Sequence, residues 1–254
     1  MSDYSFGDSR RAAARLALVA QSFEPVSRAF LESAAPRGCA RALDLGCGPG
    51  FTTRLLAEVC APHELVGLDA SPAYVAQARA AAPPGASFLV HDVTSLPFPG
   101  GAADLIHARL LLAHLREPER LLALWTSALR PGGRLLLDEV EWIRSEDPVF
   151  VRYLQLVTAM LRARGQELLI GPRLEAASRG LRRGACALRE LTLPAARAAA
   201  LFAPNLAEFR RDPAIRAAAS ESELDALATA LALRADGQAG APVAWGMRQL
   251  AIEA

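Results

Sequence analysis

The chain has 254 residues, enough for one domain with a sizeable core and an added part that covers a substrate. Its formal net charge of +1 gives no overall field that would favour nucleic acid or an anionic membrane. All 28 basic residues are arginine, which excludes a Schiff-base lysine, a pyridoxal-phosphate anchor and the lysine of a phosphate-binding P-loop.

The cysteine and hydropathy patterns narrow the class of protein further. Four cysteines show no metal-ligand spacing, so we expect no metal site and no disulfide framework. No apolar run approaches the roughly 20 residues that span a bilayer. We therefore expect a soluble, cytoplasmic protein, a monomer or homodimer, that binds neither membrane nor nucleic acid.

In chain order, the first predicted part is an N-terminal helical cap over residues 1–40. Its apolar residues recur on one helical face: Leu16, Val19, Phe23, Val26 and Phe30. From residue 41 to about 145, short apolar runs alternate with amphipathic stretches, which is typical of a doubly wound, Rossmann-like α/β sheet. The strands of this core are predicted at residues 41–45, 64–69, 87–90, 103–107 and 134–139, and its helices at 51–60, 72–82 and 117–129.

After residue 145 the pattern changes to longer amphipathic segments. Residues 146–185 are predicted as a helical insertion over the active site, after the fifth strand, with helices at 148–164 and at 171 to about 179. Residues 186–254 complete the core, with strands at 186–193 and 243–252 separated by alanine-rich helices.

A glycine-rich turn, Asp44-Leu45-Gly46-Cys47-Gly48-Pro49-Gly50, follows the first predicted strand. Doubly wound folds place their ligand crevice at this point. Glycines permit positive φ and let a ligand approach the backbone, while the following helix directs free N–H groups into the crevice. Alone such a turn is weak evidence, because tight strand-to-helix connections also use glycine.

Acidic residues at the ends of neighbouring strands strengthen the prediction. Asp69 ends the second strand, where a carboxylate can accept hydrogen bonds from a ribose diol. Asp92 follows the third strand, where it could accept from the exocyclic amine of adenine. With Asp44, three acidic groups are expected to converge on one crevice, although each alone would be an ordinary turn residue.

The same turn distinguishes between cofactors. Nicotinamide dinucleotide sites favour GxGxxG, but Phe51 stands in the position of the third glycine. Asp44 would repel a diphosphate and attract a sulfonium and an ammonium group. A cationic adenosyl cofactor is therefore favoured.

Together these segments resemble the class I S-adenosylmethionine-dependent methyltransferases, over about residues 40–141. The resemblance rests on the glycine turn, Asp69 and three further segments: His91-Asp92-Val93, Ala103 to Arg109, and Leu129 to Gly133. It implies a seven-stranded, mostly parallel sheet whose last strand is antiparallel.

The resemblance also implies a role for individual residues. Gly46, Gly48 and Gly50 would hold the methionine end of the cofactor with Asp44. Asp69 would hold the ribose, and Ala70 beside it would also contact the cofactor. Asp92 and the Val93 backbone would hold adenine, and Ala108 and Arg109 the amino acid part. Tyr4 lies in a segment similar to the N-terminal lid of small-molecule members.

Methyl transfer needs proximity, alignment and a route for the proton of the acceptor. His107, His114 and Glu139 are the candidates for proton handling, while helix packing is the alternative for His114. Arg109 could also bind an acidic acceptor, because a guanidinium suits carboxylates, or it could pair with Glu117 or Glu119 at the surface. Trp142 could line an acceptor pocket or belong to the core. The leading hypothesis is methylation of an O, N or C atom of a small molecule of specialised metabolism, with S-adenosylhomocysteine as product. The alternatives are a cyclisation or elimination that uses the same cofactor, a nicotinamide-dependent oxidation, or a non-catalytic scaffold.

Overall fold

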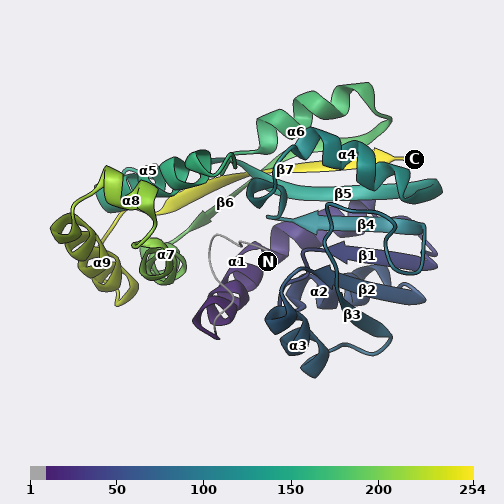
Figure 1. Ribbon diagram of the computed structural model, residues 1–254, viewed down its shortest axis with the longest axis horizontal. Helices are drawn as coiled ribbons and strands as arrows, with labels where there is room; N and C mark the ends of the chain where they lie inside the picture. The colour runs from purple at the N-terminus through teal and green to yellow at the C-terminus, as the bar shows by residue number, and fades with distance from the viewer. Residues whose placement is uncertain (1–9) are drawn as a thin grey trace.

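A seven-stranded sheet forms the centre of the computed structural model, which describes residues 10–254 (Figure 1). The strands are β1 (Arg41–Leu45), β2 (Glu64–Asp69), β3 (Ala86–Val90), β4 (Ala103–Arg109), β5 (Leu129–Arg144), β6 (Arg183–Leu193) and β7 (Val243–Glu253). Their order is β3-β2-β1-β4-β5-β7-β6, and β7 runs antiparallel to both of its neighbours. The predicted Rossmann-like sheet with an antiparallel last strand is therefore confirmed.

Helices connect the strands and cover both faces of the sheet. They are α1 (Arg10–Ala34), α2 (Phe51–Cys60), α3 (Pro72–Ala80), α4 (Pro118–Ser127), α5 (Pro148–Ala163), α6 (Gly171–Ala177), α7 (Ala195–Phe209), α8 (Pro213–Ala218) and α9 (Glu221–Ala235), with 3₁₀ turns η1 (Leu112–His114) and η2 (Ser178–Gly180). No helix among residues 10–254 is both long and apolar enough to cross a membrane.

The middle of the sheet has the burial expected of parallel strands. All five residues of β1 are buried, and β1 pairs in parallel with β2 on one side and β4 on the other. The strand order reverses between β1 and β4, and a ligand crevice forms outside the carboxyl ends of the strands at such a point. The topology thus places the crevice beside the glycine turn that follows β1.

Local capping residues determine where two of the helices begin. The Ser71 side chain accepts a hydrogen bond from Tyr74 N, and Pro72 occupies the first turn of α3. Asp147 accepts in the same way from Val149 N at the start of α5. Both caps satisfy an amide that the helix leaves without a partner, and proline is tolerated in the first turn.

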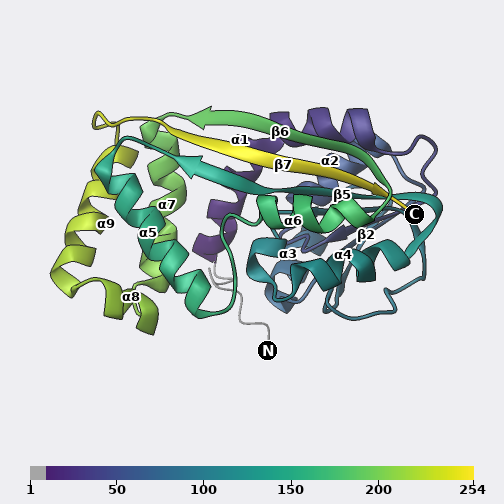
Figure 2. The same cartoon turned by 90° about the horizontal axis from the view of Figure 1, so that it is seen from above.

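Two helical layers sandwich the sheet (Figure 2). On one face, α1 and α2 pack together and bury Leu31 and Leu56 against the strands. On the other face, α4 and α6 pack together and bury Trp125 and Leu174. Because side chains alternate along β1, Leu43 and Leu45 belong to the α4 face, whereas Asp44 points to the α1 and α2 face.

A helical lobe lies beyond the carboxyl ends of the parallel strands. Strands β5, β6 and β7 extend past the rest of the sheet, and α5, α7, α8 and α9 gather at that end (Figures 1 and 2). Phe150, Tyr153, Phe202 and Trp245 are buried in its core.

The helices that form this lobe are not the same as those of the insertion predicted over residues 146–185. Helix α6 packs on the sheet beside α4, because Ile170 and Leu174 bury their side chains in the core of that face. Helices α7, α8 and α9, which come from the segment predicted to complete the core, join α5 instead. The roof over the site is therefore built from both sides of β6.

A bulge in β5 marks the beginning of the lobe. The register between β5 and β7 shifts between Val140 and Trp142, a feature that bends a strand. The Trp142 ring packs where a side chain on Gly246 would stand and lies 4.5 Å from the Arg144 guanidinium carbon. Trp142 does not line either of the two pockets described below, whereas Trp245 lines the smaller one.

Candidate active site

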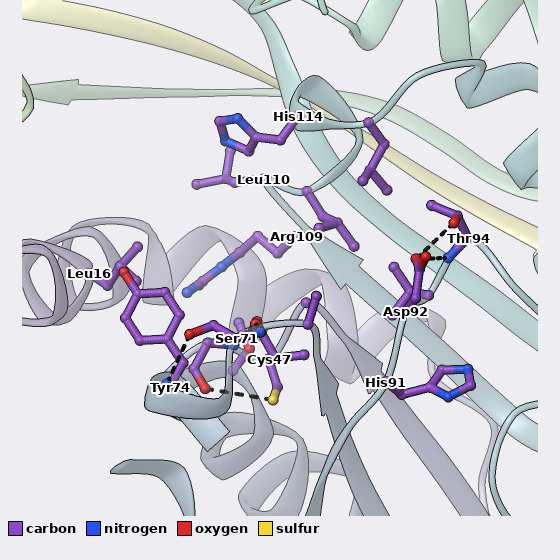
Figure 3. A pocket seen from close by; sticks show the side chains of 18 of the residues that line it. Leu16, Cys47, Ser71, Tyr74, His91, Asp92, Thr94, Arg109, Leu110 and His114 are labelled. Carbon is purple, nitrogen blue, oxygen red and sulfur yellow. Dashed lines mark hydrogen bonds between the residues drawn. The ribbon is translucent and has the colours of Figure 1, made fainter. Parts of the chain in front are cut away.

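A large pocket of about 1320 Å³ lies at the carboxyl ends of β1 to β4 (Figure 3). Its wall contains the glycine turn after β1, the segments that follow β2, β3 and β4, and residues of α1 and α3. The volume exceeds the roughly 300–1000 Å³ typical of small-ligand sites. The pocket has room for a nucleoside together with a second small molecule.

The glycine turn needs its glycines for two different reasons. Gly46, Gly48 and Gly50 have φ angles of 65°, 52° and 88°, a region that favours glycine. A Cβ on Gly46 would stand 2.6 Å from the Leu111 side chain, whereas a Cβ on Gly48 would meet, among the described residues beyond its chain neighbours, Leu16 alone within 4 Å, at 3.7 Å. Gly46 and Gly48 line the pocket, and Gly50 lies behind it at the start of α2.

Asp69 joins the second strand to the glycine turn. Its Oδ2 accepts a hydrogen bond from Gly48 N at 2.8 Å, and its Oδ1 accepts from Ser71 N at 2.8 Å. Asp69 and Ala70 both line the pocket. A carboxylate oxygen has more than one lone pair, so each can accept a further hydrogen bond from a ligand hydroxyl.

Asp92 and Val93 form another part of the wall. Asp92 Oδ1 accepts from both the hydroxyl and the backbone N–H of Thr94, and the hydroxyl is the main reason that the pKa of Asp92 lies below its usual value. The carboxylate stays ionised at neutral pH and is exposed to the pocket. Val93 is held from behind, because its carbonyl accepts from Trp125 Nε1 at 2.8 Å.

Asp44 and His107 lie under the pocket rather than in its wall. Asp44 Oδ2 accepts from the hydroxyls of Thr52 and Thr53, and Asp44 Oδ1 lies 3.3 Å from His107 Nδ1. Both side chains are about 1% exposed. Strand alternation turns Asp44 toward α2, so its influence on a bound cation would pass through the floor of the pocket rather than through direct contact.

Arg109 extends from the end of β4 into the pocket (Figure 3). Its Nη1 donates to Ser27 Oγ at 3.3 Å, and Ser27 Oγ donates in turn to Asp138 Oδ2 at 2.5 Å. Burial lowers the pKa of Arg109, although the nearby Asp138 charge opposes this effect. The guanidinium is thus a desolvated cation aimed at the space where a carboxylate could bind.

The two glutamates that were predicted as alternative partners of Arg109 lie close to other arginines. Glu119 forms an ion pair with Arg173, and Glu117 lies 4.0 Å from Arg120. Ala108, the neighbour of Arg109, is fully buried in the sheet and does not belong to the pocket wall. The backbone that lines the pocket at this place is that of Arg109 to Leu111.

Glu139 holds the loop after β4 instead of facing the pocket. Its Oε1 accepts from Leu111 N and Leu112 N, both at 2.8 Å, while Oε2 has no hydrogen-bond partner among the described residues. The side chain is fully buried, and this burial raises the pKa of Glu139 to about 8. Leu110, just before the clamped amides, has a φ of 53°, which is strained for a leucine.

His114 ends the turn η1 and reaches the pocket wall (Figure 3). Burial and the charge of Arg15 lower the pKa of His114 to about 3. Its imidazole is therefore neutral at physiological pH and can accept a hydrogen bond, but it is a weak base. Of the predicted proton-handling residues His107, His114 and Glu139, the structure brings only His114 to the pocket.

Several residues that line the large pocket were not predicted as site residues, and three of them carry polar groups beside Asp69. Cys47, Ser71 and Tyr74 line the wall beside Asp69. Burial raises the pKa of the Cys47 thiol, so it remains protonated. Ser71 could have been found from its position two residues after Asp69, at the start of a helix.

Tyr4 lies outside the described residues, and residues 10–254 contain no cluster of three metal ligands.

Comparisons with known proteins agree with this geometry. Residues 43–137 match the sequence family described as a methyltransferase domain. A trans-aconitate 2-methyltransferase of Variovorax paradoxus is 40% identical over 99 residues, which cover 39% of this chain and 38% of that protein. The chain thus matches well under half of the length of its curated relatives.

Two solved structures share the fold over most of the chain. A phosphoethanolamine N-methyltransferase 2 of Haemonchus contortus, in complex with S-adenosyl-L-methionine, superposes with a TM-score of 0.58 at 18% identity and covers 98% of this chain and 60% of its own. The [4+2]-cyclase SpnF superposes with a TM-score of 0.54 at 21% identity, covering 92% and 82%. Residues 43–137 thus match a methyltransferase domain, and they form the core of the Rossmann-like fold that the chain shares with these structures.

Proposed function

We propose that the protein transfers a methyl group from S-adenosylmethionine to an O, N or C atom of a small molecule. The observation that carries the proposal is the turn around Gly48, which leaves its backbone open to a ligand and is tied to Asp69 by a hydrogen bond of 2.8 Å. Relatives that are named trans-aconitate methyltransferases support a small acceptor. The lobe beyond the strand ends supports an enclosed one.

The residues of the pocket suit the proposed cofactor in their chemistry, and they lie along the pocket in the order of the parts of the cofactor that they would hold. Asp69 would accept from the ribose hydroxyls and Asp92 from the adenine amine, while Arg109 would bind the carboxylate. The turn at Gly46 and Gly48 would lie against the methionine chain. When bound, S-adenosylmethionine supplies an activated methyl group, and each transfer leaves one S-adenosylhomocysteine and one proton from the acceptor.

The chain itself would contribute alignment and exclusion of water more than acid–base chemistry. A neutral His114 can accept a hydrogen bond from the acceptor and so orient its nucleophilic atom. Glu139 fixes the loop that carries Leu110 and Leu111, two residues of the pocket wall. Positioning of this kind accounts for a large part of the rate in bimolecular transfers.

Calorimetry with S-adenosylmethionine, S-adenosylhomocysteine and NAD tests the cofactor assignment. We expect the two adenosyl compounds to bind and NAD to give no heat. A methyl donor with a labelled methyl group, incubated with the protein and an extract of its host, then tests the reaction. One labelled product per S-adenosylhomocysteine supports methyl transfer, whereas a converted acceptor without label supports a cyclisation or elimination.

A further inference from the structure

A second, smaller cavity of about 120 Å³ lies beside the large pocket. The two share Arg15, Val19, Leu110 and His114 in their walls, so the smaller one is an inner chamber of the same site. It lies between the sheet and the lobe, because α5, α7, β5 and β7 supply most of its remaining lining, together with Phe23, Ala113 and Leu168. We call it the inner cavity.

The inner cavity has an aromatic and aliphatic wall. Phe23 and Trp245 meet edge to face with ring centres 5.8 Å apart, and Tyr153 stacks on Phe202 at 4.2 Å. The remaining apolar lining residues are Val19, Leu110, Ala113, Val140, Ile143, Leu154, Val157, Leu168 and Leu201. Apolar cavities of about 150 Å³ accommodate benzene, so this volume suits a single ring or a group of similar size.

The side chain of Asn205 places a buried amide oxygen in this wall. Asn205 is 8% exposed, and its Nδ2 donates to Tyr153 Oη at 3.0 Å. Its Oδ1 accepts no hydrogen bond from any residue that the structure describes. A buried amide oxygen without a donor is unfavourable, so the cavity favours a ligand that brings a hydroxyl or N–H group.

The inner cavity is a poor site for a highly charged acceptor, because its apolar wall does not compensate a buried charge. Arg15, 7% exposed, is the cationic side chain among the described residues that line it, and its charge contributes to the low pKa of His114. A tricarboxylate would bury more carboxylates than these described residues could pair, at high desolvation cost.

We propose that the inner cavity is the acceptor subsite, and that it takes the ring-sized apolar part of an uncharged acceptor with a hydroxyl or N–H group that donates to Asn205 Oδ1. This inference rests on the proposed methyl transfer. The nucleophilic atom of the acceptor would then face Leu110 and His114, where the inner cavity meets the cofactor pocket.

Binding of phenol and toluene to the full chain, measured by ligand-observed NMR with S-adenosylhomocysteine present, tests the hydrogen bond. Phenol has the donor that toluene lacks, and we expect it to bind about tenfold more tightly. Asn205→Leu should remove this preference. Tyr153→Phe is the matched control, because it deletes a hydroxyl of the same wall but keeps Asn205 Oδ1, so the preference for phenol should persist.

A filled cavity tests the location. Ala113→Leu adds volume inside the wall, and Val157→Phe does so from α5 if the first variant folds poorly. Either should weaken phenol binding at least tenfold and leave the affinity for S-adenosylhomocysteine within about twofold. Unchanged phenol affinity in a variant that still binds S-adenosylhomocysteine overturns the proposal, as does tighter binding of trans-aconitate than of phenol. Failure of the unaltered chain to bind S-adenosylhomocysteine would instead contradict the proposed function.

Discussion

Asp69 accepts hydrogen bonds from two backbone amides in the wall of the large pocket, those of Gly48 and Ser71. Asp69→Ala removes the proposed ribose acceptor and loosens the glycine turn. We expect cofactor binding to weaken by about 1–3 kcal/mol, measured by calorimetry with S-adenosylhomocysteine. Asp104→Ala is the control, since Asp104 accepts from Arg41 N and Arg130 outside the pocket. Equal affinities of the two variants would contradict the role of Asp69.

Arg109 can be tested with a pair of ligands. Arg109→Met keeps the length of the side chain but removes the guanidinium. S-adenosylhomocysteine should then bind roughly tenfold or more weakly, because its carboxylate loses a charged hydrogen bond. Methylthioadenosine, which has no amino acid part, should bind the variant and the parent equally. If both ligands lose affinity to the same extent, Arg109 supports the pocket in another way.

Glu139 makes the stability of the protein depend on pH. Burial raises its pKa from 4.5 to about 8, so between these values the unfolded chain loses a proton that the folded chain keeps. The folded state then binds more protons, and the free energy of unfolding falls as pH rises from about 4.5 to 8. Glu139→Gln, which keeps an acceptor for Leu111 N and Leu112 N, should gain on the parent over this range by about 2–5 kcal/mol in urea unfolding.

The control for this effect is Glu139→Leu. It removes the titrating group and also the acceptor of two buried backbone amides, so it should be destabilised at every pH. A Gln variant whose stability relative to the parent is the same at pH 5 and pH 8 would show that Glu139 is ionised in the folded protein.

At the scale of elements, the turn between β1 and α2 depends on its backbone. Gly48→Val forces a β-branched residue into a φ of 52° and fills the space beside the turn. We expect loss of S-adenosylhomocysteine binding with a retained fold, measured by calorimetry and circular dichroism. Gly85→Val is the matched control, because its φ of 79° imposes similar strain where an added Cβ would meet no described residue beyond its chain neighbours within 4 Å. Retained binding in Gly48→Val would place the ligand elsewhere.

The predicted elements of the core agree with the structure, and those of the lobe agree less well. Strand β1 was found at its predicted residues, and β3 begins one residue earlier than predicted, because short apolar runs bounded by turn residues mark buried strands. Helices are marked instead by the periodic recurrence of apolar residues. That signal gives the position of a helix but not the layer to which it belongs. Helix α6 therefore has its predicted start at Gly171 but packs on the sheet instead of over the site.

The sequence also indicated residues of the large pocket, but it gave no indication of the inner cavity. Asp69 and Asp92 could be found because they follow consecutive strands whose ends meet. The inner cavity could not, because it combines Phe23, Tyr153 and Trp245 from distant parts of the chain without any motif. Asp44 lies just before the glycine turn, and His107 lies near the end of β4, as predicted. Strand alternation nevertheless buries both side chains beneath the pocket.

At the scale of the whole molecule, the sheet and the lobe share three strands, β5, β6 and β7 (Figure 2). We therefore expect a single cooperative unfolding transition in calorimetry. S-adenosylhomocysteine at a hundredfold excess over its Kd should raise the free energy of unfolding by about 2.7 kcal/mol and the melting temperature by roughly 5–10 °C. Two separate transitions, of which only one responds to the ligand, would show that the lobe folds independently.

The continuity of these three strands also has a mechanical consequence. Two domains joined by a short linker can rotate apart about a hinge. Here the sheet and the lobe are joined by three paired strands, which resist bending because they are hydrogen-bonded to one another. Exchange of substrates and products would therefore depend on local displacement of single-chain segments around the mouth, such as the loop between α5 and α6 that carries Gln166. Turnover in such an architecture would be sensitive to mutations in these edge segments rather than at a central hinge.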